Sequence, residues 1–92
     1  MNNRITLSKI KKYYILSSEA LLLAKKSIRS QKIKDAESIF RMVEAYLSDS
    51  QYFLKKGDYV NAFGALNYAH GWLDCGARLK IFIVSDDRFF TI

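Results

Sequence analysis

Proline is absent from this 92-residue sequence, and glycine occurs only four times. A chain without proline can form long helices without kinks, and a β-sandwich of this size would need many more turn residues. The one cysteine, Cys75, excludes an intrachain disulfide and fits a reducing compartment. No apolar run reaches the about 20 residues of a membrane span, and none resembles a secretory signal. These absences predict a helical, cytoplasmic protein without a membrane segment.

Hydrophobic side chains make up 50% of the chain, and aromatic ones make up 14%. This content excludes a disordered chain, because enough apolar surface is available to offset the entropy lost on folding. A chain of this length has room for one core, but not for a deep, walled active site as well. We therefore expect residues 1–92 to form a single domain.

The net charge of +6 is unevenly distributed along the chain. Residues 1–34 carry nine basic side chains and one acidic one, whereas residues 35–92 carry six basic and eight acidic ones. This asymmetry is compatible with an anionic partner such as RNA, DNA or an acidic protein face, although lysine-rich helices more often serve solubility. The residues that would contact an anion are Lys9, Lys11, Lys12, Lys25, Lys26 and Arg29.

Apolar residues recur at helical three- and four-residue steps in three segments of the chain. We predict an all-α, up-and-down three-helix bundle with helices at about residues 6–29, 34–56 and 59–82. Gly57 should end the second helix in the left-handed conformation, and the carboxylate of Asp58 should cap the third. Ser17 is the only polar interruption of the apolar stripe in the first helix.

The third segment contains three interior glycines, each of which costs about 1 kcal/mol relative to alanine in a helix. Close packing of neighbouring helices against Gly64, Gly71 and Gly76 would explain them. Beyond this helix the sequence changes character, with two short apolar runs on either side of a polar turn. We predict an extended C-terminal tail over residues 83–92 that packs across the bundle or against a second subunit.

The stretch Tyr68–Asp74 reads Y-A-H-G-W-L-D, and the motif G-D-Y-x-x-A-F precedes it from Gly57 onward. These motifs resemble a family of short archaeal proteins known as domain of unknown function 357. The resemblance covers about residues 35–92 and is strongest over Gly57–Leu79. It implies an archaeal source and a three-helix up-and-down bundle, and it implies no activity. Lys80 stands where the family pattern favours glycine.

His70, the only histidine, lies one helical turn from Asp74 and one turn from Asn67. The three residues could form a polar row in which Asp74 fixes the tautomer of the imidazole. Two interpretations stay open: a site for a small ligand or a reaction, and a histidine that only satisfies hydrogen bonds within the bundle. The second is favoured, because catalysis also needs a pocket and a further reactive group. No ligand spacing predicts a metal, and no cofactor is implied.

Tyr68 and Trp72 are four residues apart and therefore share a face of the third helix, on the side away from the expected core. Phe89 and Phe90 of the tail either cover this aromatic pair or join it in an interaction surface. We therefore expect a non-enzymatic interaction module, with a second copy of the chain or another protein as its partner. Nucleic-acid binding by the basic first helix, and an enzymatic or small-ligand site at the polar row, are the alternatives.

Overall fold

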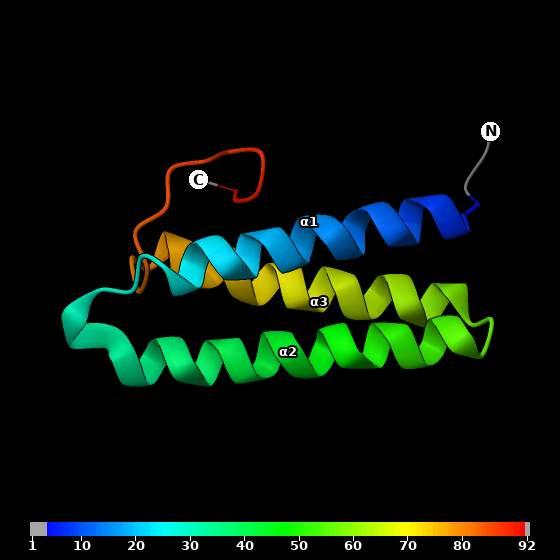
Figure 1. The fold of residues 1–92 in the computed structure, drawn as a ribbon, viewed down its shortest axis with the longest axis horizontal. Helices are drawn as coiled ribbons and strands as arrows, with labels where there is room; N and C mark the ends of the chain where they lie inside the picture. Colours follow the sequence, from blue (N-terminus) through cyan, green and yellow to red (C-terminus); the bar gives the residue numbers. More distant parts are fainter. Residues whose placement is uncertain (1–3, 92) are drawn as a thin grey trace.

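The computed structural model describes residues 4–91, which form three α-helices and one short 3-10 helix. Helix α1 spans Leu7–Lys25, the 3-10 helix η1 spans Ser30–Lys32, α2 spans Ile33–Lys55 and α3 spans Tyr59–Arg78. Helices α1 and α3 run in the same direction and α2 runs in the opposite one (Figure 1). The predicted all-α, up-and-down three-helix bundle is confirmed. Within the described part of the chain, no helix is long and apolar enough to cross a membrane.

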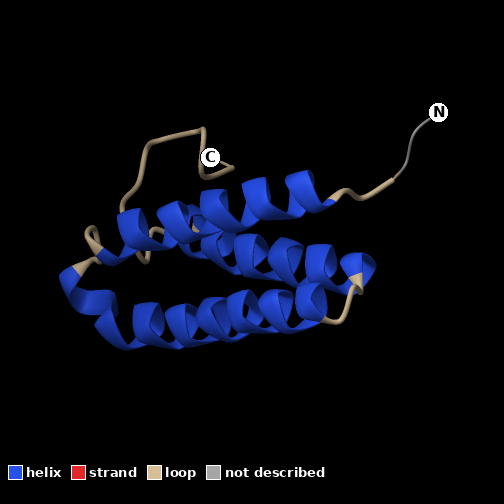
Figure 2. Ribbon diagram, turned by 45° about the vertical axis from the view of Figure 1, so that its right-hand side comes forward, coloured by secondary structure: helices blue, strands red, loops and turns tan. Residues whose placement is uncertain are grey.

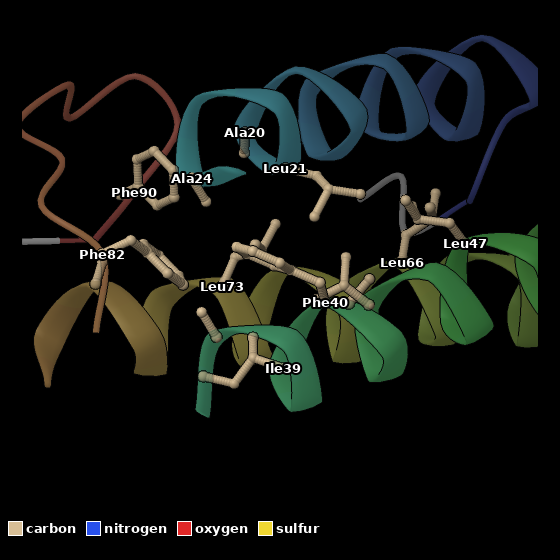
Figure 3. Packing of buried hydrophobic residues seen from close by; sticks show 14 of the residues in the cluster. Ala20, Leu21, Ala24, Ile39, Phe40, Leu47, Leu66, Leu73, Phe82 and Phe90 are labelled. Carbon is tan, nitrogen blue, oxygen red and sulfur yellow. The ribbon is translucent and has the colours of Figure 1, made fainter. Parts of the chain in front are cut away.

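Helix α3 is the central element of the bundle. It packs along both of the other helices, whereas α1 and α2 touch each other little (Figures 1 and 2). The core lies where side chains from all three helices meet, and Leu66 and Leu73 of α3 are almost completely buried there (Figure 3). Burial of a leucine side chain stabilises a fold by about 1.5–3 kcal/mol, so the inner side of α3 holds the bundle together.

The turn between α2 and α3 has the predicted chemistry. Gly57 has a φ of 73°, and its N–H donates a hydrogen bond to the carbonyl of Leu54. The N–H of Asp58 donates to the carbonyl of Phe53 at 2.9 Å, which completes the hydrogen-bond pair of a Schellman motif. The carboxylate of Asp58 then accepts from the N–H of Asn61 at 3.1 Å and caps α3. A glycine and an aspartate thus end one helix and begin the next.

Helix α3 ends at Arg78, about one turn earlier than predicted. The chain reverses through a second Schellman motif, in which the N–H of Lys80 donates to the carbonyl of Ala77 and the N–H of Ile81 donates to that of Gly76. Lys80 has a φ of 57°, so it lies outside the helix, whereas the predicted end near residue 82 placed it within the helix. Glycine fits this left-handed conformation better than lysine does, because residues with a Cβ adopt it at a cost of about 1–2 kcal/mol.

Helix α1 ends at Lys25 instead of near residue 29, because the backbone that follows pairs with the tail. Ile28 and Phe82 form an antiparallel β-bridge. The N–H of Arg29 donates to the carbonyl of Ile81 at 3.0 Å, and the N–H of Ile83 donates to the carbonyl of Ser27 at 2.8 Å. Of the two arrangements predicted for the tail, the described residues show the packing across the bundle, since Phe90 is buried and Thr91 bonds to α3, whereas Ile92 lies outside them.

Phe82 lies at the centre of this end of the bundle. Its ring is completely buried, stacks on Phe40 of α2 at a centroid distance of 5.7 Å and lies 6.3 Å from the ring of Phe90 (Figure 3). A Cβ atom added at Gly76 would overlap the ring of Phe82 and lie 3.2 Å from the side chain of Ile39. Gly76 is therefore explained mainly by the tail, rather than by helix packing alone.

We predict that Lys80→Gly raises the free energy of unfolding by about 1 kcal/mol, because glycine adopts the left-handed conformation without the penalty that lysine has. For a domain of this size the melting temperature should rise by about 4–8 °C. Thermal and urea unfolding measure the change. Gly57→Ala is the matched control at the other Schellman motif and should lower the stability by a similar amount. An unchanged or lower stability of Lys80→Gly would contradict the prediction.

Candidate functional site

The predicted polar row on α3 is bonded to α1 and to the tail. The Nδ1 atom of His70 lies 3.4 Å from the hydroxyl oxygen of Ser17 on α1, and which of the two donates depends on the imidazole tautomer. The Nε2 atom of His70 lies 3.8 Å from Oδ1 of Asp74. The same Oδ1 accepts a hydrogen bond from the backbone N–H of Thr91 at 2.8 Å. His70 and Asp74 therefore connect three segments that are distant in the sequence.

Ser17 gives the cluster of Ser17, His70 and Asp74 a role in the stability of the fold. Its hydroxyl is buried between α1 and α3, and a buried hydroxyl without a partner costs about 1–3 kcal/mol. His70 supplies that partner. The sequence marks Ser17 as the one polar residue in an apolar stripe, but its pairing with His70 depends on how α1 and α3 are aligned, which the stripe does not reveal.

Asn67 does not join the polar row. It lines the same shallow pocket of about 230 Å³ as His70 and Asp74, but in residues 4–91 its side chain forms no hydrogen bond with either of them. No group of three His, Cys, Asp or Glu side chains in that range is arranged to hold a metal ion. Cys75 is exposed and does not line this pocket, so no thiol lies beside the imidazole. The polar atoms of His70 and Asp74 can form hydrogen bonds with a ligand, but they already contact Ser17, each other and the backbone of Thr91.

A turn in the tail directs its aromatic residues inward. The side chain of Arg88 donates to the carboxylate of Asp86 at 2.7 and 3.0 Å, and this hydrogen bonding holds the pKa of Asp86 below its ordinary value. The same contact raises the pKa of Arg88. The N–H groups of Phe89 and Phe90 both donate to the carbonyl of Asp86, which closes the turn. Phe90 is then 2% exposed and packs on Phe82.

The placement of Phe90 corrects the expected interaction surface. Phe90 is a core residue, and Phe89 is half-buried beside the guanidinium of Arg88. Among the described residues, neither ring pairs with the rings of Tyr68 or Trp72. The tail therefore neither stacks on the aromatic pair of α3 nor forms a continuous aromatic surface with it.

The side of α3 that points away from the core is called the outer face. It consists of Val60, Gly64, Asn67, Tyr68, Gly71, Trp72 and Cys75. Tyr68 is 65% exposed and stacks on Tyr46 of α2 with 5.3 Å between the ring centroids. Trp72 is 38% exposed. None of these seven residues is acidic or basic, and the charged side chains of Asp49 and Arg78 lie at the two ends of the face, so its centre is an uncharged surface with two large aromatic side chains.

Two hollows flank Tyr68 on the outer face. One, of about 310 Å³, lies around Gly71 and Trp72, and the other, of about 180 Å³, lies around Gly64 and Asp49. A Cβ atom at either glycine would have no neighbouring atom within 4 Å. The prediction that packing between helices of this chain explains Gly64 and Gly71 is therefore wrong. Each lowers the stability of α3 by about 1 kcal/mol without serving a contact inside the described chain.

The six residues expected to contact an anion fall into two groups. They are Lys9, Lys11 and Lys12 near the start of α1, and Lys25, Lys26 and Arg29 at and beyond its end. The two groups are roughly 20 Å apart along the helix axis. Lys25 forms an ion pair with Glu44 at 3.3 Å, and the ammonium of Lys9 lies 5.1 Å from the ring centroid of Phe63. The guanidinium of Arg29 donates to the carbonyl of Lys80 at 3.5 Å. The β-bridge between Ile28 and Phe82 therefore places Lys80 beside the second group.

The fold defines a class: a small up-and-down helical bundle with a central third helix, closed at one end by its C-terminal tail. The family described as protein of unknown function, DUF357, matches residues 12–82, and the chain belongs to this family. The match includes most of α1, which lies outside the expected range of 35–92, and it ends before the tail. No curated protein and no solved structure matches the chain. Membership of a family of unknown function assigns no activity.

We predict that Asp74→Ala lowers the free energy of unfolding by about 1–2 kcal/mol, because the hydrogen bond from Thr91 to a charged, partly buried carboxylate is lost. Hydrogen exchange of the Thr91 amide should become faster in the same variant. Glu37→Ala, at an exposed carboxylate on α2, is the control and should change the stability by less than about 0.5 kcal/mol. Equal effects of the two substitutions would contradict the structural role of Asp74.

Proposed function

We propose that this protein is a non-enzymatic interaction module that binds a protein partner through the outer face of α3. The observation that carries the proposal is the pair of helix-interior glycines, Gly64 and Gly71, that face open space on an exposed side of the central helix. Each costs stability, and no contact within the described chain uses the space they leave. A second protein surface that approaches α3 closely would use it.

The aromatic residues beside the glycines support the same proposal. Tyrosine and tryptophan are enriched among the residues that contribute most to binding, because they bury a large area and lose little conformational freedom. Tyr68 and Trp72 flank the larger hollow, so the outer face offers both projecting rings and a recess. Charged residues are depleted at the centres of interfaces, and the centre of the outer face carries none.

The contacts of the polar row favour binding over catalysis. A general base must reach a substrate proton with a free atom. In His70, Nδ1 lies against Ser17 and Nε2 faces Asp74, and Asp74 itself holds the backbone of the tail. A substrate at this position would have to displace contacts that join α1, α3 and the tail.

Nucleic-acid binding is the second candidate, and one observation favours it. The bridge between Ile28 and Phe82 gathers Arg29, Arg78 and Lys80 at one end of the bundle. None of the three forms an ion pair with a carboxylate among residues 4–91. Unpaired basic side chains in one place can neutralise neighbouring phosphates of a nucleic-acid backbone.

A photo-crosslinking amino acid placed at position 68 tests the interaction face. We expect adducts of defined mass with a protein, either this chain or another, when cells that express the Tyr68 variant are irradiated. Leu22 on α1 is the matched control position, because it is 59% exposed and lies on another helix. The proposal is wrong if both positions give the same adducts, or if neither gives any.

Binding to labelled single-stranded RNA, tRNA and duplex DNA across a salt series tests the second candidate. Three phosphate contacts on a single strand predict that the logarithm of the affinity falls with the logarithm of salt concentration with a slope of about −2. Arg29→Glu and Lys80→Glu should weaken binding more than Lys12→Glu, which lies in the other basic group. No binding at low salt would exclude this candidate.

A further inference from the structure

We infer that the partner of the outer face is a second copy of this chain, with the two α3 helices packed antiparallel about a two-fold axis close to Gly71. This inference rests on the proposed function, because it names the occupant of the same face. A self-complementary patch is what a two-fold interface requires, since each residue i that contacts a residue j is matched by a residue j that contacts i. Three properties of the outer face meet this requirement.

The first property is the placement of charge at the two ends of the outer face. Asp49 lines the hollow at Gly64, and Arg78 lies 14 residues, or about four helical turns, further along α3. Neither forms an ion pair among the described residues. Gly71 is midway between positions 64 and 78, so an antiparallel pair centred there places each Asp49 beside the Arg78 of the other copy. A parallel pair would place like charges together, which is unfavourable.

The second property is the match between projections and recesses. In the antiparallel arrangement centred on Gly71, position 68 of one copy lies at the same height along the helix axis as position 74 of the other, because each is three residues from the two-fold axis. Tyr68 of each copy therefore meets the hollow between Gly71 and Cys75 of its counterpart. The absence of a side chain at Gly71 lets the two helix backbones approach most closely at the axis.

The third property is the available area. A stable interface buries about 800 Å² on each partner, which is roughly an eighth of this chain's accessible surface of 6315 Å². Helix α3 has 20 residues and is therefore about 30 Å long. An interface of this size is wider than a single helix, whose diameter is about 10–12 Å, so it would include the adjoining surface of α2 around Tyr46 and Asp49 as well as the outer face. A partner with a strongly charged surface would find no complementary charge at the centre of this face.

Sedimentation equilibrium of the purified chain tests the inference. We expect a dimer at micromolar concentration, and a dissociation constant at least ten times higher for Gly71→Leu. A side chain at this position has open space within one copy, so the variant should keep the circular dichroism spectrum and the unfolding behaviour of a folded bundle. Ser48→Leu, at an exposed site on α2 that lines neither hollow, is the control for added bulk.

Charge reversal tests the antiparallel arrangement. Asp49→Arg and Arg78→Asp should each weaken the dimer about ten-fold, and the double variant should restore it, because both reversed charges are present in every copy. The thiols of Cys75 should lie about 12 Å apart along the axis, since eight residues separate the two positions at 1.5 Å each. A flexible bifunctional maleimide of that length should therefore join two copies, and Cys75→Ser should prevent it.

The two proposals fail in different ways. A chain that stays monomeric up to hundreds of micromolar, or a Gly71→Leu variant that dimerises as well as the original chain, overturns the inference of a second copy. If position 68 still crosslinks to a different protein in cells, the interaction face itself stands. If position 68 gives no adduct and the chain is monomeric, both are wrong. A double charge variant that is no tighter than either single variant overturns the antiparallel arrangement.

Discussion

The ring of Phe82 occupies the space that a side chain at position 76 would need, and three parts of the chain meet at this contact. Phe40 of α2 stacks on the ring, Phe90 of the tail packs against it, and the backbone of Phe82 pairs with Ile28 beyond α1. Helices α1 and α2 have few direct contacts, among them the ion pair of Lys25 and Glu44, and Phe82 adds to these contacts at this end of the bundle. Phe82 therefore links α2, the tail and the backbone beyond α1 at a single point.

The ends of α1 and α3 follow from that contact. Helix α3 has to stop at Arg78 so that the chain can turn back and place Phe82 over Gly76, and the turn puts Lys80 in the left-handed conformation. That conformation costs about 1–2 kcal/mol. Burial of a phenylalanine side chain contributes about 1.5–3 kcal/mol, and the backbone bonds to residues 27–29 add to it, so the reversal is favourable overall. The same bonds take residues 27–29 out of α1.

The sequence predicts the local features of this fold and misses the distant ones. The turn at Gly57 and Asp58 depends on residues that are adjacent in the chain, and the three helices follow from the spacing of apolar residues, so both are predicted correctly. The contact between Ser17 and His70 spans 53 residues and depends on the alignment of two helices that no local pattern encodes. For the same reason, the phenylalanines of the tail predict that it packs on the bundle, but they do not predict that Phe90 enters the core.

Two of the four glycines are required by the fold of this chain, and the other two are not. Gly57 has a left-handed backbone, and Gly76 makes room for Phe82, so the bundle itself requires both. Gly64 and Gly71 have helical backbones and open surroundings, and alanine at either would stabilise α3 by about 1 kcal/mol. Selection for stability alone would favour that change, whereas selection for close contact with another surface opposes it. The polar atoms of His70 and Asp74 are already used inside the chain, whereas the space beside Gly64 and Gly71 on the outer face of α3 is used by no contact within residues 4–91.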